Sequence, residues 1–107
     1  MFDCRAIHNP GRYEEYKRKN GRDIEVIDFL DKTGEAAPFV DNAIKIVSPS
    51  IERYLKRGFT SLQVGFGCTG GQHRSVYCAE KFASEIKDKY PETNIEVIHI
   101  EKENWVV

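Results

Sequence analysis

One stretch decides the fold: Leu62-Gln63-Val64-Gly65-Phe66-Gly67-Cys68-Thr69-Gly70-Gly71-Gln72-His73-Arg74-Ser75. Up to Phe66, apolar residues alternate with small or polar ones, which is the period-2 pattern of a strand. After Arg74, apolar residues recur with helical spacing, at Val76, Ala79, Phe82 and Ile86. The glycines between the two patterns let the backbone turn sharply and let a ligand approach closely. The stretch therefore predicts a strand, a glycine-rich loop and a helix in succession.

The predicted loop is a candidate anion-binding site. The first backbone N–H groups of a helix have no intrahelical partner, and they lie at the positive end of the helix dipole. Arg74 adds a guanidinium group that can hold a phosphate through two parallel hydrogen bonds. The candidate ligand-binding residues of the loop are Cys68, Thr69, Gly70, Gly71, His73, Arg74 and Ser75.

The remaining patterns predict a small α/β domain. We expect a strand in residues 2–7, a helix from the N-cap Asp23 to Gly34, a longer helical segment closed by Gly58, a helix ending near Tyr90, and a strand in residues 94–100. Pro49 leaves two alternatives for the longer segment, because the helix either kinks there or ends and restarts with Ser48 as its cap. The order β-αα-β-α-β predicts a three-layer sandwich with a mainly parallel sheet, formed by a single domain over residues 1–107.

Composition narrows the class of protein. The chain has 107 residues, of which 40% are hydrophobic and 31% charged, and its net charge is -1, so no global basic field points to nucleic acid. The three cysteines form no C-x-x-C pair, which argues against a disulfide framework or a zinc site and for a reducing compartment. Neither a transmembrane run nor a signal peptide is present. We therefore expect a cytoplasmic protein without metal or cofactor. The strand that starts at residue 2 predicts a piece of a longer chain.

The predicted topology brings a second segment to the loop. Ligands of parallel sheets bind beyond the carboxyl ends of the strands, and both His8 and Asn9 follow the first strand, as the loop follows the second. Arg5 lies at the same edge and is also spaced to pair with Asp3. A basic cluster comes next, formed by Arg12, Lys17, Arg18, Lys19 and Arg22. This cluster is either a solvated loop or a surface for RNA or a protein partner.

The spacing from Cys68 to Arg74 is C-x5-R, the spacing of the cysteine phosphatase loop. In that chemistry the cysteine thiolate is the nucleophile, the arginine binds phosphate, and a following hydroxyl such as that of Ser75 assists the leaving thiolate. Asp3 and Asp23 are the candidates for a general acid. Cys4 and Cys78, in contrast, are expected in the core.

The residues Gly67 to Glu80, G-C-T-G-G-Q-H-R-S-V-Y-C-A-E, resemble the signature of the C-terminal domain of the RapZ family of RNase adapter proteins. Phe2-Asp3-Cys4-Arg5 with Asn9-Pro10 is similar to a second motif of that family. The segment from Cys4 to Tyr13 resembles the family variant that is fused to a phosphotransferase-like domain.

The resemblance implies a sugar-phosphate-binding fold that senses glucosamine-6-phosphate, contacts RNA and has a missing N-terminal partner domain. It implies that Arg74 and the loop amides take the phosphate, while His73 contacts a hydroxyl or phosphate oxygen. A pocket histidine of the family falls at Gly11 in this chain, which makes His8 a candidate replacement. We therefore predict a domain that binds a ligand and catalyses no reaction. Formation of a homo-oligomer is left open, and a cysteine phosphatase is the alternative function.

Overall fold

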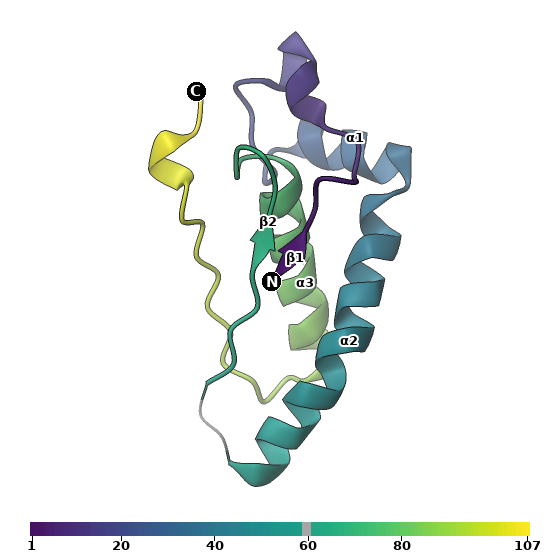
Figure 1. Ribbon diagram of the computed structural model, residues 1–107, viewed down its shortest axis with the longest axis vertical. Helices are drawn as coiled ribbons and strands as arrows, with labels where there is room; N and C mark the ends of the chain where they lie inside the picture. The colour runs from purple at the N-terminus through teal and green to yellow at the C-terminus, as the bar shows by residue number, and fades with distance from the viewer. Residues whose placement is uncertain (59–60) are drawn as a thin grey trace.

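The computed structural model describes residues 1–58 and 61–107 of the chain. Figure 1 shows two short strands lying in front of a helix, with a second, longer helix beside them and an extended C-terminal segment on the other side. The strands and helices are β1 (Phe2–Asp3), α1 (Ile24–Thr33), α2 (Ala36–Arg57), β2 (Phe66–Gly67) and α3 (Arg74–Lys89). Three short 3-10 helices complete the order: η1 (Pro10–Arg12), η2 (Glu14–Tyr16) and η3 (Lys102–Asn104).

The two strands are parallel, and Phe2 lies opposite Phe66 in the register. The amide of Phe2 donates to the carbonyl oxygen of Gly65, and the amide of Cys4 donates to that of Gly67, both at 2.7 Å. Parallel strands need a crossover connection, which α1 and α2 supply here. The predicted α/β class and the parallel pairing of the first two strands are confirmed.

The first strand is shorter than the predicted residues 2–7. The backbone N–H of Arg5 donates to the Asp3 carboxylate at 3.0 Å, and the N–H of Ile7 donates to the carbonyl oxygen of Cys4 at 3.1 Å. An aspartate that accepts from the backbone two residues later folds the chain into a local turn. The period-2 pattern therefore ends at Asp3, although the sequence alternates further.

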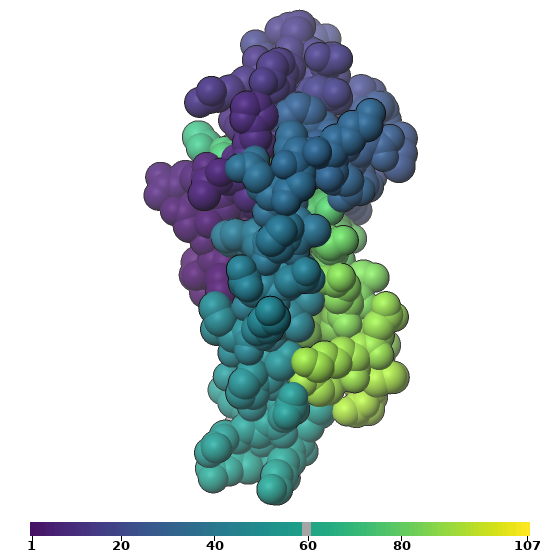
Figure 2. All heavy atoms as spheres, turned by 90° about the vertical axis from the view of Figure 1, so that its right-hand side faces the viewer, coloured from purple at the N-terminus to yellow at the C-terminus, as the bar shows by residue number. Residues whose placement is uncertain are grey.

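Helices α2 and α3 pack against the strands to form the core. The ring of Phe2 stacks on that of Phe66, with 5.5 Å between centroids, and Phe66 in turn contacts Phe82 of α3 at 5.3 Å. The core also contains Cys4, Ile7, Val26, Leu30, Ala36, Val40, Ala43, Val47, Ile51, Tyr77, Cys78, Ile86 and Tyr90. Figure 2 shows α2 running down one face of an elongated molecule, with the N-terminal residues along one edge. The principal extents are 48 × 28 × 20 Å.

Helix α2 continues through Pro49, which decides between the two alternatives left open by the sequence. Pro49 is exposed, so the carbonyl group that loses its helical partner can bind water instead. Ser48 does not cap a new helix, because its hydroxyl accepts a 3.0 Å hydrogen bond from the Lys89 ammonium. Gly34 and Gly58 end α1 and α2 as predicted, each with φ near +73°. Among the described residues, no helix combines the length and apolarity that a membrane span requires.

The predicted strand in residues 94–100 is wrong. This segment runs beside residues 61–66, but no backbone hydrogen bond between described residues joins the two, and a hollow of about 380 Å³ lies between them. Its apolar positions change parity between Val97 and Ile98, so no single face can be buried along its whole length. Ile98 is accordingly 69% exposed and Ile100 is 88% exposed.

Candidate anion-binding site

The glycine-rich loop connects β2 to α3, as predicted. Gly71 has φ +66°, a conformation that a residue with a side chain rarely adopts, and His73 precedes the first helical residue. Thr69 and Gly70 are exposed, whereas residues 72–78 are buried. The loop therefore presents its first part to solvent and anchors its second part in the fold.

Arg74 is the first residue of α3 and is only 5% exposed. Its Nη1 donates to the carbonyl oxygens of Arg5 and Ile7, both at 2.9 Å, and its Nη2 lies 3.4 Å from the Thr69 hydroxyl. The buried Nε has no hydrogen-bond partner in the described part of the chain. Among residues 1–58 and 61–107, the ion pairs do not include Arg74. The hydrogen bonds of this buried cation thus go to two carbonyl oxygens and one hydroxyl group, all of them uncharged.

Cys68 lies at the base of the loop. Its thiol donates to the Ser75 hydroxyl at 3.3 Å. Burial raises the pKa of Cys68, but once the thiol is ionised the Ser75 hydroxyl and the amides of Ser75 and Gly71 donate to the sulfur. Together with the charge of Arg74, these donors leave the pKa below its ordinary value. Several donors around one sulfur favour the thiolate, as they would favour any anion at this position.

Two side chains fasten the loop to the segment before α1. Gln72 donates from its amide nitrogen to the carbonyl oxygens of Lys17 and Lys19, at 3.2 and 2.9 Å. The Nε2 of His73 lies 2.8 Å from the carbonyl oxygen of Tyr16. Because that partner is an acceptor only, Nε2 carries the proton, and Nδ1 of the neutral ring is left as an acceptor. These three hydrogen bonds fix the position of the loop.

A close backbone approach at Gly21 completes this fastening. The amide of Gly21 donates to the carbonyl oxygen of Gln72 at 2.9 Å. A Cβ atom at Gly21 would lie 2.4 Å from both the carbonyl oxygen of His73 and the amide nitrogen of Tyr77. Only glycine fits against the start of α3 in this way. In the sequence, the signal for this contact is a glycine between two polar residues.

The C-terminal residues cover one side of the loop. The indole nitrogen of Trp105 donates to the carbonyl oxygen of Gly71 at 2.8 Å. Gln72 and the backbone of Val106 exchange two hydrogen bonds, of 2.9 and 3.0 Å. His99 pairs with Glu80 at 2.6 Å and lies beside the Trp105 ring, so this segment is tied to α3 as well. We call residues 99–106 the C-terminal strap.

The first segment reaches the loop as the topology predicted. Gly11 lies beside the His73 ring, because a Cβ there would be 3.3 Å from Cε1 and 3.4 Å from Nδ1. Asn9 caps η1 by accepting from the Gly11 amide at 2.9 Å. The His8 side chain contacts the Tyr13 hydroxyl at 2.7 Å and belongs to an aromatic cluster with Phe29. The Arg5 side chain pairs with Asp3 at 2.7 Å, as expected, and contributes its carbonyl oxygen to Arg74.

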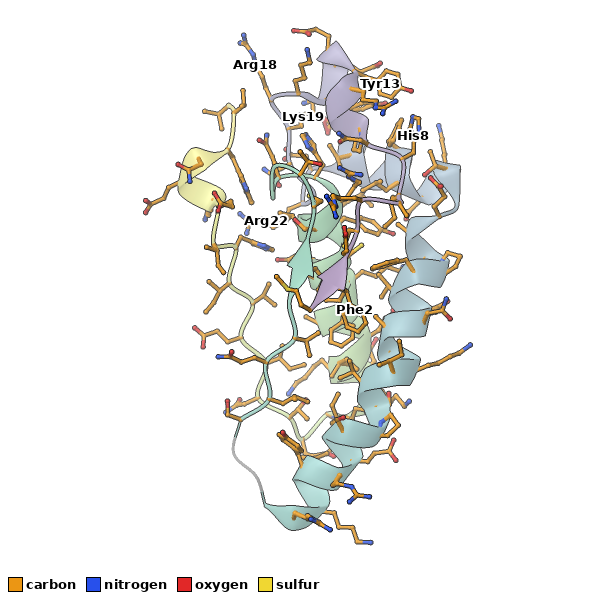
Figure 3. All side chains as sticks on the ribbon, viewed as in Figure 1. Phe2, His8, Tyr13, Arg18, Lys19 and Arg22 are labelled. Carbon is orange, nitrogen blue, oxygen red and sulfur yellow. The ribbon has the colours of Figure 1, made fainter. Side chains whose placement is uncertain are left out.

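The basic cluster separates into paired and unpaired cations. Lys17 pairs with Glu14 at 3.1 Å, and Lys19 pairs with Glu25 at 2.7 Å. The Arg22 guanidinium lies over the Trp105 ring at 5.8 Å, and Figure 3 shows it between the loop region and the C-terminal strap. Arg12 and Arg18 are exposed and make no ion pair with another described residue, and Figure 3 shows Arg18 pointing away from the fold.

A family profile described as the RapZ C-terminal domain matches residues 1–103. A relative from Thermosipho africanus is 38% identical over 90 residues, which is 84% of this chain and 32% of that protein. A Clostridium kluyveri relative is 37% identical over 103 residues, 96% of this chain and 35% of that protein. A Thermosipho melanesiensis relative is 46% identical over 81 residues, 76% of this chain and 29% of that protein. All three are named nucleotide-binding proteins, and the chain spans about a third of their length.

Proposed function

Since the chain belongs to the family of RapZ C-terminal domains, we propose that it binds a small phosphorylated metabolite, of the sugar-phosphate kind exemplified by glucosamine-6-phosphate, without a chemical step. The observation that carries the proposal is the buried cation of Arg74, which has an unpartnered Nε and no carboxylate partner among the described residues. An anion beside it would supply the missing counter-charge.

Electrostatics favours an anion at this point of the fold. Removing a charge from water is unfavourable unless it is paired and hydrogen-bonded, and carbonyl dipoles compensate Arg74 only in part. Helix α3 has 16 residues and begins at Arg74, so the positive end of its dipole lies at the same place. The exposed Thr69 and Gly70 leave this end of the loop open to a ligand. Charge, dipole and access therefore coincide.

The loop residues divide into contact and support roles in this proposal. Arg74, the Thr69 hydroxyl and the amides of Gly70 and Gly71 bind the phosphate, while Cys68 and Ser75 form the base of the pocket. His73 holds Tyr16 through Nε2, so only Nδ1 is left for the ligand. As an acceptor facing Gly11, Nδ1 suits a sugar hydroxyl or ammonium group better than a phosphate oxygen.

The test maps binding onto individual amides. The protein is titrated with glucosamine-6-phosphate, inorganic phosphate, a nucleoside monophosphate and glucosamine, and amide resonances are followed by two-dimensional NMR. We expect the phosphorylated compounds to shift the resonances of residues 69–75, with the sugar phosphate effective at the lowest concentration, and glucosamine to shift none of them. A nucleotide that binds more tightly than the sugar phosphate would reassign the ligand. Unshifted loop resonances with all four compounds would contradict the proposal.

A surface for RNA or a protein partner is the second part of the proposed function. Arg12 and Arg18 carry it, because their charges are exposed and not engaged in ion pairs with described residues. Each phosphate contact that displaces a counterion makes the affinity for RNA fall with added salt. The Arg12→Ala, Arg18→Ala double variant should therefore weaken RNA binding and flatten its salt dependence. The matched control removes two exposed cations of α2, with Lys56→Ala and Arg57→Ala. Equal affinities of the two double variants for RNA would rule out Arg12 and Arg18 as its binding surface.

A cysteine phosphatase is the competing function, and the hydrogen bond between Cys68 and Ser75 favours it. A thiolate at the base of an amide-lined loop is the arrangement that nucleophilic attack on phosphorus requires. A phosphatase also needs a general acid, however, and the candidate Asp3 is held as a carboxylate by the Arg5 guanidinium at 2.7 Å. We therefore expect no turnover of an aryl phosphate. Hydrolysis that is abolished by Cys68→Ser would overturn the proposal of binding alone.

A further inference from the structure

Three cysteines belong to, or pack against, the same buried core cluster beneath the loop. Cys4 follows β1, and its amide donates to the carbonyl oxygen of Gly67, the residue before Cys68. Cys78 lies on α3, one turn after Ser75, and is buried in the same core cluster as Cys4. Cys68 packs against the same core cluster and contacts Ser75 at 3.3 Å. All three are free cysteines.

The three thiols differ in access. Cys4 and Cys78 are 0% exposed, whereas Cys68 is partly exposed. A solute that oxidises thiols therefore reaches Cys68 first. Among residues 1–58 and 61–107, no group of three or more His, Cys, Asp or Glu is placed to hold a metal ion.

We propose that Cys68 is a site of reversible oxidation by hydroperoxides and that a core thiol, of Cys4 or Cys78, resolves the oxidised form as a disulfide. The Cys68 thiolate attacks the terminal oxygen of the hydroperoxide, the O–O bond breaks, and an alcohol leaves as the sulfur becomes a sulfenic acid. The core thiol then attacks this sulfur, an S–S bond forms, and water leaves. In total, two thiols and one hydroperoxide give one disulfide, one alcohol and one water.

The environment of Cys68 supports the first step. The Ser75 hydroxyl and the amides of Ser75 and Gly71 stabilise its thiolate against the opposing effect of burial, so its pKa is lowered. The Cys4 thiol and burial raise the pKa of Cys78, so its sulfur is less reactive toward a peroxide than that of Cys68. Thiolate character and exposure both select Cys68 as the entry point.

The oxidation has a consequence for the loop that rests on the proposed function. A bond to a core sulfur draws Cys68 away from Ser75 and from the amides that we assign to the phosphate. Oxidised protein should therefore bind the sugar phosphate more weakly than reduced protein. The cysteine chemistry itself is read by mass, so its failure is distinguishable from a failure of ligand binding.

The test treats the protein with one equivalent of hydrogen peroxide and reads intact mass and a non-reducing peptide map. We expect loss of the mass of two hydrogen atoms, a Cys68-containing disulfide, and full reversal by dithiothreitol. Cys68→Ser should lose this product completely, and the separate variants Cys4→Ala and Cys78→Ala identify the resolving thiol, because only one of them should leave Cys68 as a sulfenic acid that dimedone traps. Irreversible oxidation of Cys68 without a disulfide, or a Cys4–Cys78 disulfide that forms equally fast in Cys68→Ser, would overturn the proposal.

Discussion

Arg74 Nη1 donates a 2.9 Å hydrogen bond to the carbonyl oxygen of Ile7, a residue 67 positions earlier in the chain. The same nitrogen reaches the carbonyl oxygen of Arg5. One side chain at the start of α3 thereby holds the turn that follows β1 against the loop that follows β2. The carboxyl ends of both strands meet at this point, so the residue proposed to bind the ligand also joins the two segments that form the site.

Gly21→Ala should destabilise the fold. The added methyl group would lie 2.4 Å from the His73 carbonyl oxygen and the Tyr77 amide nitrogen, and neither backbone atom can move without disturbing the start of α3. We expect the free energy of unfolding to fall by about 1–3 kcal/mol in urea denaturation. Gly70→Ala is the matched control, since a Cβ there meets nothing within 4 Å. Equal free energies of unfolding for the two variants would contradict the close backbone contact at Gly21.

Trp105→Phe tests the C-terminal strap. The substitution keeps an aromatic ring but removes the N–H that donates to the Gly71 carbonyl oxygen. Loss of one such hydrogen bond should lower the free energy of unfolding by about 0.5–1.5 kcal/mol. Hydrogen exchange at Val106 should also become faster, because its amide is protected by the neighbouring contact with Gln72. Val107→Ala, at a residue that is 93% exposed, should leave both measurements unchanged.

Local patterns predicted the helices and the loop, whereas contacts between distant segments escaped them. The apolar spacing of α3 and the terminal glycines Gly34 and Gly58 carried enough information to place the helices. The strap was not predicted, because its contacts pair Trp105 with Gly71 through a backbone carbonyl that any residue possesses. The strand predicted in residues 94–100 is not formed, although the β-branched residues of this segment favour a strand. Its apolar residues change from one face to the other after Val97, so a strand could not bury all of them.

For the binding site too, local patterns were informative and contacts between distant segments were not. The residue types around the loop predicted an anion-binding site. The parallel topology correctly placed the segment after β1 beside the loop. The sequence did not show that the Nη1 atom of Arg74 is occupied by carbonyl oxygens or that Nε2 of His73 is held by Tyr16. Both facts depend on backbone positions far away in the chain.

The Asp3 carboxyl should titrate far below an ordinary aspartate. The hydrogen bonds from the Arg5 side chain, followed by that from its amide, lower the pKa of Asp3 from 3.8 to about 2. A carboxyl group whose pKa is lowered by folding stabilises the fold at any pH above its ordinary pKa. This contribution is lost as the pH falls from about 4 towards 2. Carbon-detected NMR titration should show the low midpoint, and Arg5→Gln should raise it. Arg12→Gln is the control, and an ordinary midpoint in the unmodified protein would refute the pair.

Ser75→Ala should raise the pKa of Cys68. The variant removes the hydroxyl that hydrogen-bonds the sulfur but leaves the amides of Ser75 and Gly71 in place. The rate of alkylation by iodoacetamide follows the thiolate fraction, so its pH profile should shift to higher pH in the variant. Ser84→Ala, at an exposed position of α3, is the matched control. An unchanged profile in Ser75→Ala would mean that the hydroxyl does not stabilise the thiolate.

The central claim is that the buried charge of Arg74 binds the phosphate of a small metabolite, and calorimetric titration with glucosamine-6-phosphate tests it most directly. The unmodified protein should bind, and Arg74→Gln should lose at least about tenfold in affinity, since a charge-assisted hydrogen bond contributes about 1.5–3 kcal/mol. Arg53→Gln, an exposed substitution on α2, should bind normally. Thr69→Val, at an exposed loop position, provides a second variant that should bind more weakly, because it removes the hydroxyl 3.4 Å from Arg74 Nη2 and leaves the guanidinium charge in place. Binding of unchanged affinity by a folded Arg74→Gln protein, or no binding by the unmodified protein, would contradict the account.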